Sequence, residues 1–353
     1  MASLLERKLI VVTGKGGAGK TTVACALGLL GARRGLRTIV VEFGDLHRLP
    51  GLFGHSDAPK SGVEVELEDG LWSISIDPDK ALIEWLRTLG GRISVRMLAA
   101  SSTFHYFAAA APGAKELVSM VKVRELCEGP GTDERTRSAD ERTRGDARRE
   151  NARYDLVVLD APATGHALAM LRSPETFAAI VRVGPLAEQA QGVRELLEDA
   201  RRSAYVAVTH AAEMAVSETL ELEQGLRRHL DRDLDAVVVN GTLPRRFTRE
   251  ELERIAATTG ESSPVGGAPA RASPANGPPA KSADSEVLVA SAARMARAVN
   301  HRARIQQTQV ARLRRQRFAE GMPPSVVTLP FVFTPEIGLT AIRELAASLD
   351  RKL

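Results

Sequence analysis

The chain of 353 residues has few cysteines, few aromatic residues and little net charge. Its two cysteines, Cys25 and Cys127, lie far apart, which excludes a disulfide framework and a CxxC zinc site within one chain. The formal net charge of +4, from 48 basic and 44 acidic residues, is too small to indicate nucleic-acid binding. No apolar run reaches the roughly 20 residues of a membrane-spanning helix, and the short N-terminal apolar stretch runs into glycines, unlike a signal peptide. We therefore expect a protein of the reducing cytoplasm that is not integral to a membrane.

Short β-branched runs alternate with helical patterns along most of the chain. The first 45 residues predict a strand over Leu9–Thr13, a helix over Lys20–Arg33 that Gly35 ends, and a second strand over Thr38–Val41. Further strands are expected at Leu71–Ile76, Leu156–Leu159, Tyr205–Val208, Ala236–Val239 and Val326–Leu329, with helices at Asp79–Leu89, Glu195–Arg202 and Glu336–Leu349. This order predicts an α/β fold with a doubly wound, mostly parallel sheet, in which residues 1–353 form a single domain.

Three segments depart from this alternation. Residues 79–128 contain no strand pattern and predict a helical lobe inserted into the α/β core. Residues 129–153 are almost entirely polar and contain DERTR twice, which predicts a solvated insertion that is disordered or a loose helix. Residues 260–285, rich in Pro, Gly, Ala and Ser, predict a flexible linker.

The strongest motif is a glycine-rich loop between the first strand and the first helix. It reads Gly14-Lys15-Gly16-Gly17-Ala18-Gly19-Lys20-Thr21-Thr22, fits the phosphate-binding pattern GxxxxGK[ST], and holds two of the nine lysines. Glycines let backbone N–H groups turn toward phosphate oxygens, and the helix N-terminus adds its dipole. The pattern assigns Lys20 to the β- and γ-phosphates, the Thr21 hydroxyl to Mg²⁺ and Thr22 to the α-phosphate, so we expect ATP and Mg²⁺ as ligands.

Two motifs resemble a known family of ATPases. The loop sequence KGGxGK[ST] resembles the deviant Walker A motif of ATPases related to the nitrogenase iron protein. The run from Asp160 to His166, DAPATGH, resembles the switch II motif DTAPTGH of ArsA and of the ATPases that target tail-anchored proteins. The resemblance implies a P-loop NTPase with a nitrogenase iron-protein-like fold, most similar to bacterial single-domain ArsA-like ATPases. It also implies that Asp160 holds Mg²⁺ through a water, and that Lys15 reaches the nucleotide of a second subunit in a homodimer or in a heterodimer with a paralogue.

Two later segments extend the resemblance to the nucleotide base. Asn240 follows a predicted strand and resembles the Asn that recognises adenine, although an amide there also suits a loop cap. Pro335 lies in Thr334–Gly338, which resembles the loop that closes over the base. His166 and His210 are expected to be structural or loop residues, because no metal-ligand spacing connects them.

Switch I departs from the DPAH motif of the relatives. Its strand ends Val41-Glu42-Phe43-Gly44-Asp45, so Glu42 takes the place of the Asp thought to position the attacking water, and Asp45 follows three residues later. Either carboxylate suits that task. The CxxC zinc clamp of eukaryotic relatives is absent. We expect Cys25 in the core and Cys127 half exposed, which makes a poor soft-metal site.

These observations predict an ATPase that couples its nucleotide state to a client. The apolar segment Ala81–Leu126 forms either an ordinary helical core or, as in relatives, a groove for a membrane helix, so a targeting or chaperone-type ATPase for hydrophobic segments is the first hypothesis. The alternatives are the energy-coupling subunit of an anion or metalloid (arsenite) pump, and a nucleotide-dependent switch or scaffold with little turnover. Ser291–Ala319 has eight Arg and no acid, which predicts a long basic helix facing solvent, an acidic partner or anionic lipid.

Overall fold

A computed structural model describes residues 4–55, 60–89, 113–129, 153–180, 185–258, 281–319 and 325–352. Its centre is one eight-stranded sheet with the order β3-β4-β2-β5-β1-β6-β7-β8. The strands are β1 (Leu9–Gly14), β2 (Thr38–Phe43), β3 (Val65–Glu68), β4 (Leu71–Ile76), β5 (Leu156–Ala163), β6 (Ser203–His210), β7 (Ala236–Thr242) and β8 (Val326–Pro330). All neighbouring strands are parallel except β3 and β4. The predicted mostly parallel α/β sheet is confirmed, and only the short edge strand β3 was not predicted.

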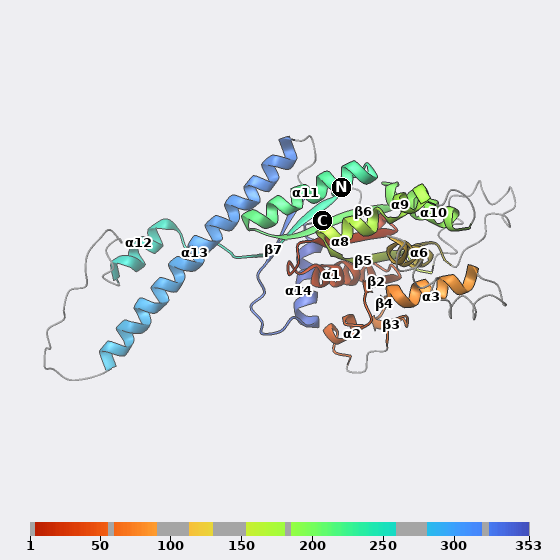
Figure 1. Cartoon of the computed structure of the whole chain (residues 1–353). Coiled ribbons are helices and arrows are strands. Elements are labelled where there is room, and N and C mark those ends of the chain that lie inside the picture. The colour runs from red at the N-terminus through yellow and green to blue at the C-terminus, as the bar shows by residue number, and fades with distance from the viewer. Residues whose placement is uncertain are drawn as a thin grey trace.

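Helices cover both faces of this sheet (Figure 1). They are α1 (Lys20–Arg33), α2 (Leu49–Leu52), α3 (Pro78–Leu89), α6 (Ala114–Glu128), α8 (Thr164–Leu171), α9 (Ser173–Ile180), α10 (Pro185–Glu198), α11 (Glu213–Leu230), α12 (Arg249–Thr258), α13 (Lys281–Ala319) and α14 (Leu339–Asp350), after a 3-10 turn at Leu4–Glu6. Helix α1 packs against α14 on one face, and α6, α8 and α11 lie on the other.

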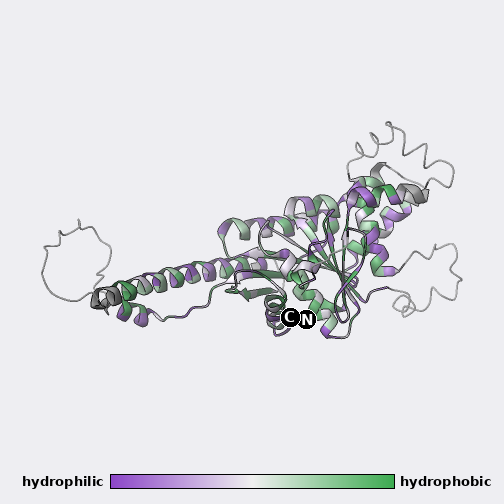
Figure 2. Cartoon of the chain, turned by 90° about the horizontal axis from the view of Figure 1, so that it is seen from below, coloured by the Kyte–Doolittle hydropathy of each residue, from purple (hydrophilic) through white to green (hydrophobic). Residues whose placement is uncertain are grey.

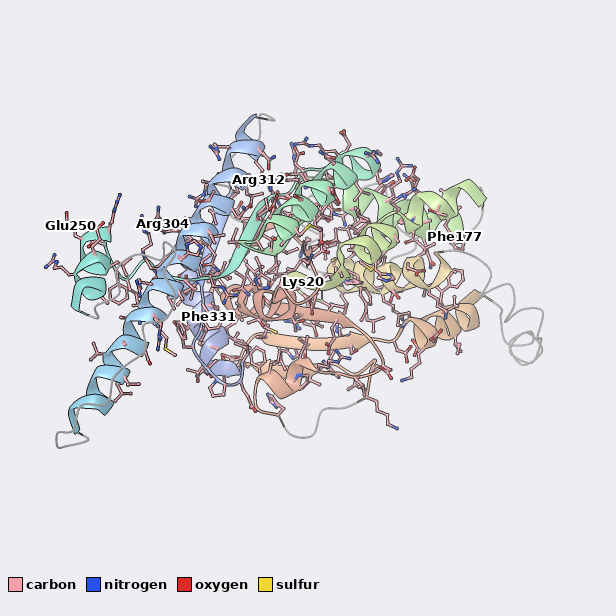
Figure 3. All side chains as sticks on the ribbon, turned by 60° about the vertical axis from the view of Figure 1, so that its left-hand side comes forward. Lys20, Phe177, Glu250, Arg304, Arg312 and Phe331 are labelled. Carbon is pink, nitrogen blue, oxygen red and sulfur yellow. The ribbon has the colours of Figure 1, made fainter. Side chains whose placement is uncertain are left out.

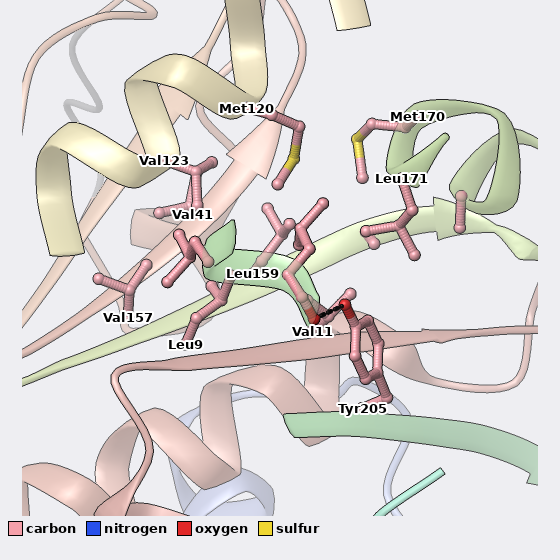
Figure 4. Packing of buried hydrophobic residues seen from close by; sticks show 14 of the residues in the cluster. Leu9, Val11, Val41, Met120, Val123, Val157, Leu159, Met170, Leu171 and Tyr205 are labelled. Carbon is pink, nitrogen blue, oxygen red and sulfur yellow. Dashed lines mark hydrogen bonds between the residues drawn. The ribbon is translucent and has the colours of Figure 1, made fainter. Parts of the chain in front are cut away.

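The two faces of β1 belong to two separate hydrophobic cores. Leu9 and Val11 pack in one cluster, whereas Ile10 and Val12 pack in the other, and all four side chains are fully buried. Successive side chains of a strand point to opposite faces, so a strand covered by helices on both sides is apolar throughout. Figure 4 shows the first cluster, where β-strand side chains meet methionines of α6 and α8. Figure 2 shows hydrophobic residues concentrated in the strands and on the sides of the helices that face them.

Several predicted boundaries were wrong. The helix expected at Glu195–Arg202 begins at Pro185 and ends at Glu198, because Asp199 to Arg202 form a turn in which Arg202 N–H donates to the Asp199 carbonyl at 3.0 Å. The last helix begins at Leu339, after Gly338 as N-cap. The basic helix begins at Lys281, so residues 281–285 are helical rather than part of the linker. They follow Pro279, the last Pro of that segment, so no Pro interrupts the helix there. The rest of that linker lies outside the described residues.

The helical lobe is described in part. Helices α3 and α6 pack against each other, and Leu82, Trp85 and Met120 are buried in the core. Residues 90–112 of the lobe and residues 130–152 of the polar insertion lie outside the described residues. Cys25 is buried as expected, but the expectation of a half-exposed Cys127 was wrong: it is 2% exposed, because the last turn of α6 packs against the sheet.

Candidate functional site

The glycine-rich loop lies between the carboxyl end of β1 and the start of α1. Gly17 and Gly19 have φ values of 78° and 88°, a left-handed conformation that glycine adopts without strain. The loop closes on itself, since Ala18 N–H donates to the Lys15 carbonyl at 3.2 Å, and Gly19 is the N-cap of α1. Lys20 begins the helix, with Nζ 3.5 Å from the Lys15 carbonyl oxygen. A helix N-terminus that opens from such a loop is suited to bind an anion.

The remaining residues of the loop differ in exposure. Gly14 is buried against β6, where a Cβ atom would lie 2.1 Å from the Val208 carbonyl oxygen. Gly16 and Gly17 are exposed, whereas Thr21 and Thr22 are partly buried in the first turn of α1. The loop therefore offers backbone to solvent at its tip and hydroxyl groups at its base.

Asp160 lies beside the base of this loop. Its strand β5 pairs with β1 and β2, which places Asp160 opposite Val12 and Glu42. Asp160 Oδ2 accepts a hydrogen bond from the Thr21 hydroxyl at 2.6 Å, whereas Oδ1 is buried and has no hydrogen-bond partner in the part of the chain that the structure describes. A carboxylate oxygen without a partner next to a hydroxyl is a donor set that Mg²⁺ prefers, so these residues fit that ion.

The ionisation of Asp160 is disfavoured by its surroundings. Burial raises its pKa to about 6, and the opposing effects of the Thr21 hydrogen bond and the Lys20 charge are smaller. Burial also raises the pKa of Cys25, and the charges of Asp160 and Glu42 add to that effect. The ionised carboxylates of this buried site would therefore be stabilised by a bound cation.

Replacing Asp160 with Asn is expected to stabilise the chain near neutral pH when nucleotide is absent and EDTA is present. The folded-state pKa exceeds the unfolded value, so the folded chain binds more protons between pH 4 and pH 6, and its free energy of unfolding falls as the pH rises through that window. The Asn side chain does not ionise, so the variant does not lose this free energy of unfolding, which amounts to about 3 kcal/mol at most. Urea unfolding at pH 7.5 should show the gain, and unfolding near pH 4 should not. Asp79→Asn, at an exposed carboxylate, serves as the control; equal stability of wild type and Asp160→Asn at pH 7.5 would contradict the argument.

Glu42 and Asp45 line one cavity of about 210 Å³ together with Lys20, Thr21 and Asp160. Glu42 is only 7% exposed, and its Oε1 accepts hydrogen bonds from the backbone N–H groups of Arg48 at 2.6 Å and Leu49 at 3.3 Å. Burial raises the pKa of Glu42, the two amide bonds lower it, and the Asp160 charge raises it further. Asp45, in contrast, is exposed. The structure therefore gives one predicted acid a fixed position and leaves the other at the surface.

Lys15 does not join this cluster. Its Nζ forms an ion pair with Glu218 of α11 at 2.5 Å, and the two side chains are 36% and 33% exposed. An ion pair with this exposure contributes at most about 1 kcal/mol, so it opens readily. The Lys15 side chain is thus held by its own chain and is not among the side chains that line the cavity.

Asn240 and His210 contact the loop from β7 and β6. Asn240 Nδ2 donates to the Ala18 carbonyl at 3.0 Å, and Asn240 Oδ1 accepts from Gly241 N–H at 2.9 Å, so the side chain does cap its own loop. His210 was not predicted as a site residue, yet its Nε2 lies 3.1 Å from the Gly17 carbonyl oxygen. Its place at the end of the strand next to β1 was a usable signal, because parallel strands end at the same edge of the sheet.

The segment after β8 brings exposed rings to the same edge. Pro335 is exposed, and the Thr334 hydroxyl donates to the Glu336 carbonyl at 2.8 Å. Phe331 and Phe333 are 49% and 70% exposed, with ring centroids 4.8 Å apart. A Cβ atom on Gly241 would lie 3.7 Å from the Phe331 ring, so this aromatic pair adjoins the residue that follows Asn240. Figure 3 labels Phe331. His166, by comparison, is exposed in the first turn of α8.

Comparison with known proteins points to one family. The model of the family described as anion-transporting ATPase matches residues 7–189, just over half of the chain, including the glycine-rich loop and Asp160. ATPase BagA of Mycobacterium tuberculosis is 27% identical over 255 residues, covering 70% of this chain and 69% of the relative. ATPase GET3C of Arabidopsis thaliana is 25% identical over 296 residues, covering 69% of each chain. ATPase GET3 of Paracoccidioides lutzii is 26% identical over 198 residues, covering 54% of this chain and 50% of the relative.

Proposed function

Because this chain belongs to the anion-transporting ATPase family and is an ATPase, we propose that it hydrolyses Mg-ATP as a dimer and uses its nucleotide state to bind and release a client with a hydrophobic segment. The observation that carries the proposal is the cluster of Lys20, Thr21 and Asp160 around the loop. We place this activity in the reducing cytoplasm, in keeping with two free thiols.

The residues of the cluster would divide the work as follows. The backbone N–H groups of Gly16 to Gly19 and the Lys20 ammonium would hold the phosphate oxygens, and Thr22 would reach the α-phosphate. The Thr21 hydroxyl and Asp160, the latter through a water, would hold Mg²⁺, which when bound draws charge from the phosphate oxygens. Asn240 and Pro335 would contact the adenine. Catalysis of phosphoryl transfer rests mainly on such positioning and charge stabilisation.

We propose that Glu42 rather than Asp45 orients the attacking water. Two backbone amides fix one of its carboxylate oxygens, and it lines the cavity beside Lys20. Burial raises the pKa of Glu42, which makes its carboxylate a stronger proton acceptor. Glu42→Gln keeps the acceptor for the two amides but loses the base, so kcat should fall about 100-fold with KM little changed. Asp45→Asn is the matched control and should stay within about twofold of wild type in a steady-state ATPase assay. The reverse order of the two effects would assign the water to Asp45.

The client proposal rests on the helical lobe and on its link to switch II. Helix α6 of the lobe contacts both β5, which carries Asp160, and α8, which begins at Thr164 directly after it. A shift of switch II on hydrolysis would therefore reach the lobe through packed elements. In the described part of the lobe Leu82, Trp85 and Met120 are buried, whereas Ile83 is 42% exposed. Further apolar residues of the lobe lie outside the described residues: Met97, Leu98, Phe104, Tyr106 and Phe107.

A fluorescent peptide of apolar, membrane-helix type tests this function. Its affinity is expected to differ about tenfold between the chain with a non-hydrolysable ATP analogue and the chain with ADP, because a client site coupled to switch II must differ between the two states. Anisotropy titration measures the difference, and a helical peptide of equal length with a polar sequence is the control. Equal affinity in the two nucleotide states and in apo protein would reject the client proposal and favour the switch or scaffold alternative.

The arsenite-pump alternative is less well supported. Both cysteines are buried, and burial raises the pKa of Cys127 to about 12. Trivalent arsenic binds thiolates, which are disfavoured at both positions. We therefore expect arsenite to leave the ATPase rate unchanged.

A further inference from the structure

Helix α13 extends beyond the α/β body (Figure 1). We call residues 287–305 of this helix the arm. Its later part fixes it to the body. Gln306 Nε2 donates to the Gly241 carbonyl at 3.1 Å, and Arg312 donates to the Ser217 hydroxyl at 3.3 Å. Arg317 and Glu223 of α11 form a buried pair at 2.9 Å. The arm itself therefore projects from the point at which the later part of α13 is fixed to the body.

An apolar stripe follows the arm on its outer side. Leu288, Met295 and Val299 are spaced seven and four residues apart, which places them on one side of a helix, and they are 69%, 70% and 38% exposed. Ala293 and Asn300 lie on another side and are 3% and 5% exposed. Further exposed apolar side chains of the arm are Val287, Val289 and Ile305. An exposed stripe of this kind on one helix indicates a contact surface.

After Asp284 and Glu286 near its start, the charged residues of α13 are all arginines. Residues 287–319 contain no Asp or Glu, and Arg294, Arg302 and Arg304 of the arm are exposed. Figure 2 shows hydrophobic and hydrophilic residues alternating along this helix, and Figure 3 shows Arg304 on it. Helix α12, which packs beside α13, is close to neutral, because it sets three Glu against Arg249 and Arg254. The outer surface of the arm is thus both apolar and cationic.

We propose that the arm binds the surface of an anionic phospholipid bilayer, with Leu288, Met295 and Val299 entering the interface and the arginines contacting lipid phosphates. Helices with an apolar side and arginines beside it lie in the plane of such an interface. A second copy of this chain is a poor occupant, because two arms would place arginine against arginine. The exposed side of the arm, opposite its buried residues, is also convex and is not the kind of groove that receives a partner helix. The arm does not cross the bilayer: in the described part of the chain, no helix, α13 included, has the length and apolar character of a membrane span.

Vesicle flotation of the full chain tests this proposal. We expect the protein to float with vesicles of equimolar phosphatidylcholine and phosphatidylglycerol, and to stay at the bottom with phosphatidylcholine alone. Charge reversal at Arg294, Arg302 and Arg304 to Glu should reduce the floated fraction about tenfold, and so should Leu288→Ser with Met295→Ser and Val299→Ser. Both variants change exposed positions, and a circular dichroism spectrum equal to that of wild type verifies that they fold.

The matched control reverses three exposed arginines elsewhere, Arg33→Glu, Arg201→Glu and Arg351→Glu, which alters the net charge by the same amount. It should float like wild type. Flotation that persists in the arm charge reversal, or that is lost equally in the control, would overturn the proposal. So would flotation with neutral vesicles to the same extent. Failure to float, together with binding of polyglutamate by wild type but not by the arm charge reversal, would overturn it in favour of an acidic protein partner.

Discussion

A Lys20→Ala chain is expected to hydrolyse ATP about 1000-fold more slowly than wild type. Lys20 stands at the first position of α1, beside the loop and in the cavity with Asp160, and its charge already lowers the pKa of that carboxyl. Under the proposed function the loop holds this ammonium against the phosphates, where phosphoryl transfer builds up charge that the shortened side chain cannot offset. A coupled assay for ADP release at saturating Mg-ATP measures the loss in kcat.

The control for this variant is Lys80→Ala, at a lysine whose side chain is 54% exposed and pairs with Asp77. It removes the same charge at a distance from the loop and should keep the wild-type rate within about twofold. Thermal unfolding of both variants separates loss of chemistry from loss of fold. A Lys20→Ala chain with more than a tenth of the wild-type rate would show that the loop does not supply the main phosphate contact.

Local motifs made the loop and its neighbours predictable from sequence. Glycines followed by Lys20 and Thr21 between a strand and a helix specify the backbone there. Asp160 was identified by the resemblance of DAPATGH to a switch II motif, and its place at the end of a strand that pairs with β1 brings it beside the loop. Both the loop and Asp160 adjoin a strand or helix that fixes the local backbone, so a short motif was enough to locate them. The sheet was predictable for the same reason, because apolar runs of β-branched residues reflect burial on both faces.

Contacts between distant elements could not be read from the sequence. The Lys15–Glu218 pair joins positions 203 residues apart, and nothing near Glu218 distinguishes it from the other acids of α11. Glu42 likewise reads as a site acid, whereas its bonds to Arg48 and Leu49 depend on how the chain turns after β2. The burial of Cys127 follows from the packing of α6 on the sheet, which the local pattern does not contain. In each case a tertiary contact decides the environment of the side chain.

Helix α11 connects the loop with the root of the arm. Within two turns it carries Glu218, which holds Lys15; Ser217, which accepts from Arg312; and Glu223, which pairs with Arg317. The Arg317–Glu223 pair is buried, so removing one partner would leave an uncompensated charge, and this end of α11 is firmly held. The Lys15–Glu218 end is exposed and weak by comparison. Any event that draws Lys15 away from Glu218 therefore breaks the weaker of the two ion pairs of α11 and leaves the Arg317–Glu223 pair in place.

Mixing two inactive variants is expected to restore ATP hydrolysis. Lys15→Ala should lower kcat about 1000-fold, as expected for loss of a cation supplied in trans, while ATP binding to its own intact loop persists. In a mixed dimer with Lys20→Ala, one site combines the intact Lys20 of one chain with the intact Lys15 of the other. An equal mixture that exchanges subunits freely forms half its dimers as mixed pairs with one working site, so the rate should return to about a quarter of wild type.

The same experiment separates trans action from action within one chain. If Lys15 served its own nucleotide, neither chain of a mixed pair would hold a complete site and the mixture would stay inactive. The control mixture joins Lys15→Ala with a double variant that lacks both lysines, and it should show no recovery.

Glu218→Ala tests the ion pair that holds Lys15 within its own chain. The variant frees Lys15 from this pair, so dimer formation with ATP should tighten about fivefold, in line with the small energy of an exposed ion pair. Unchanged dimer affinity in Glu218→Ala would mean that the pair does not compete with the partner's nucleotide for Lys15.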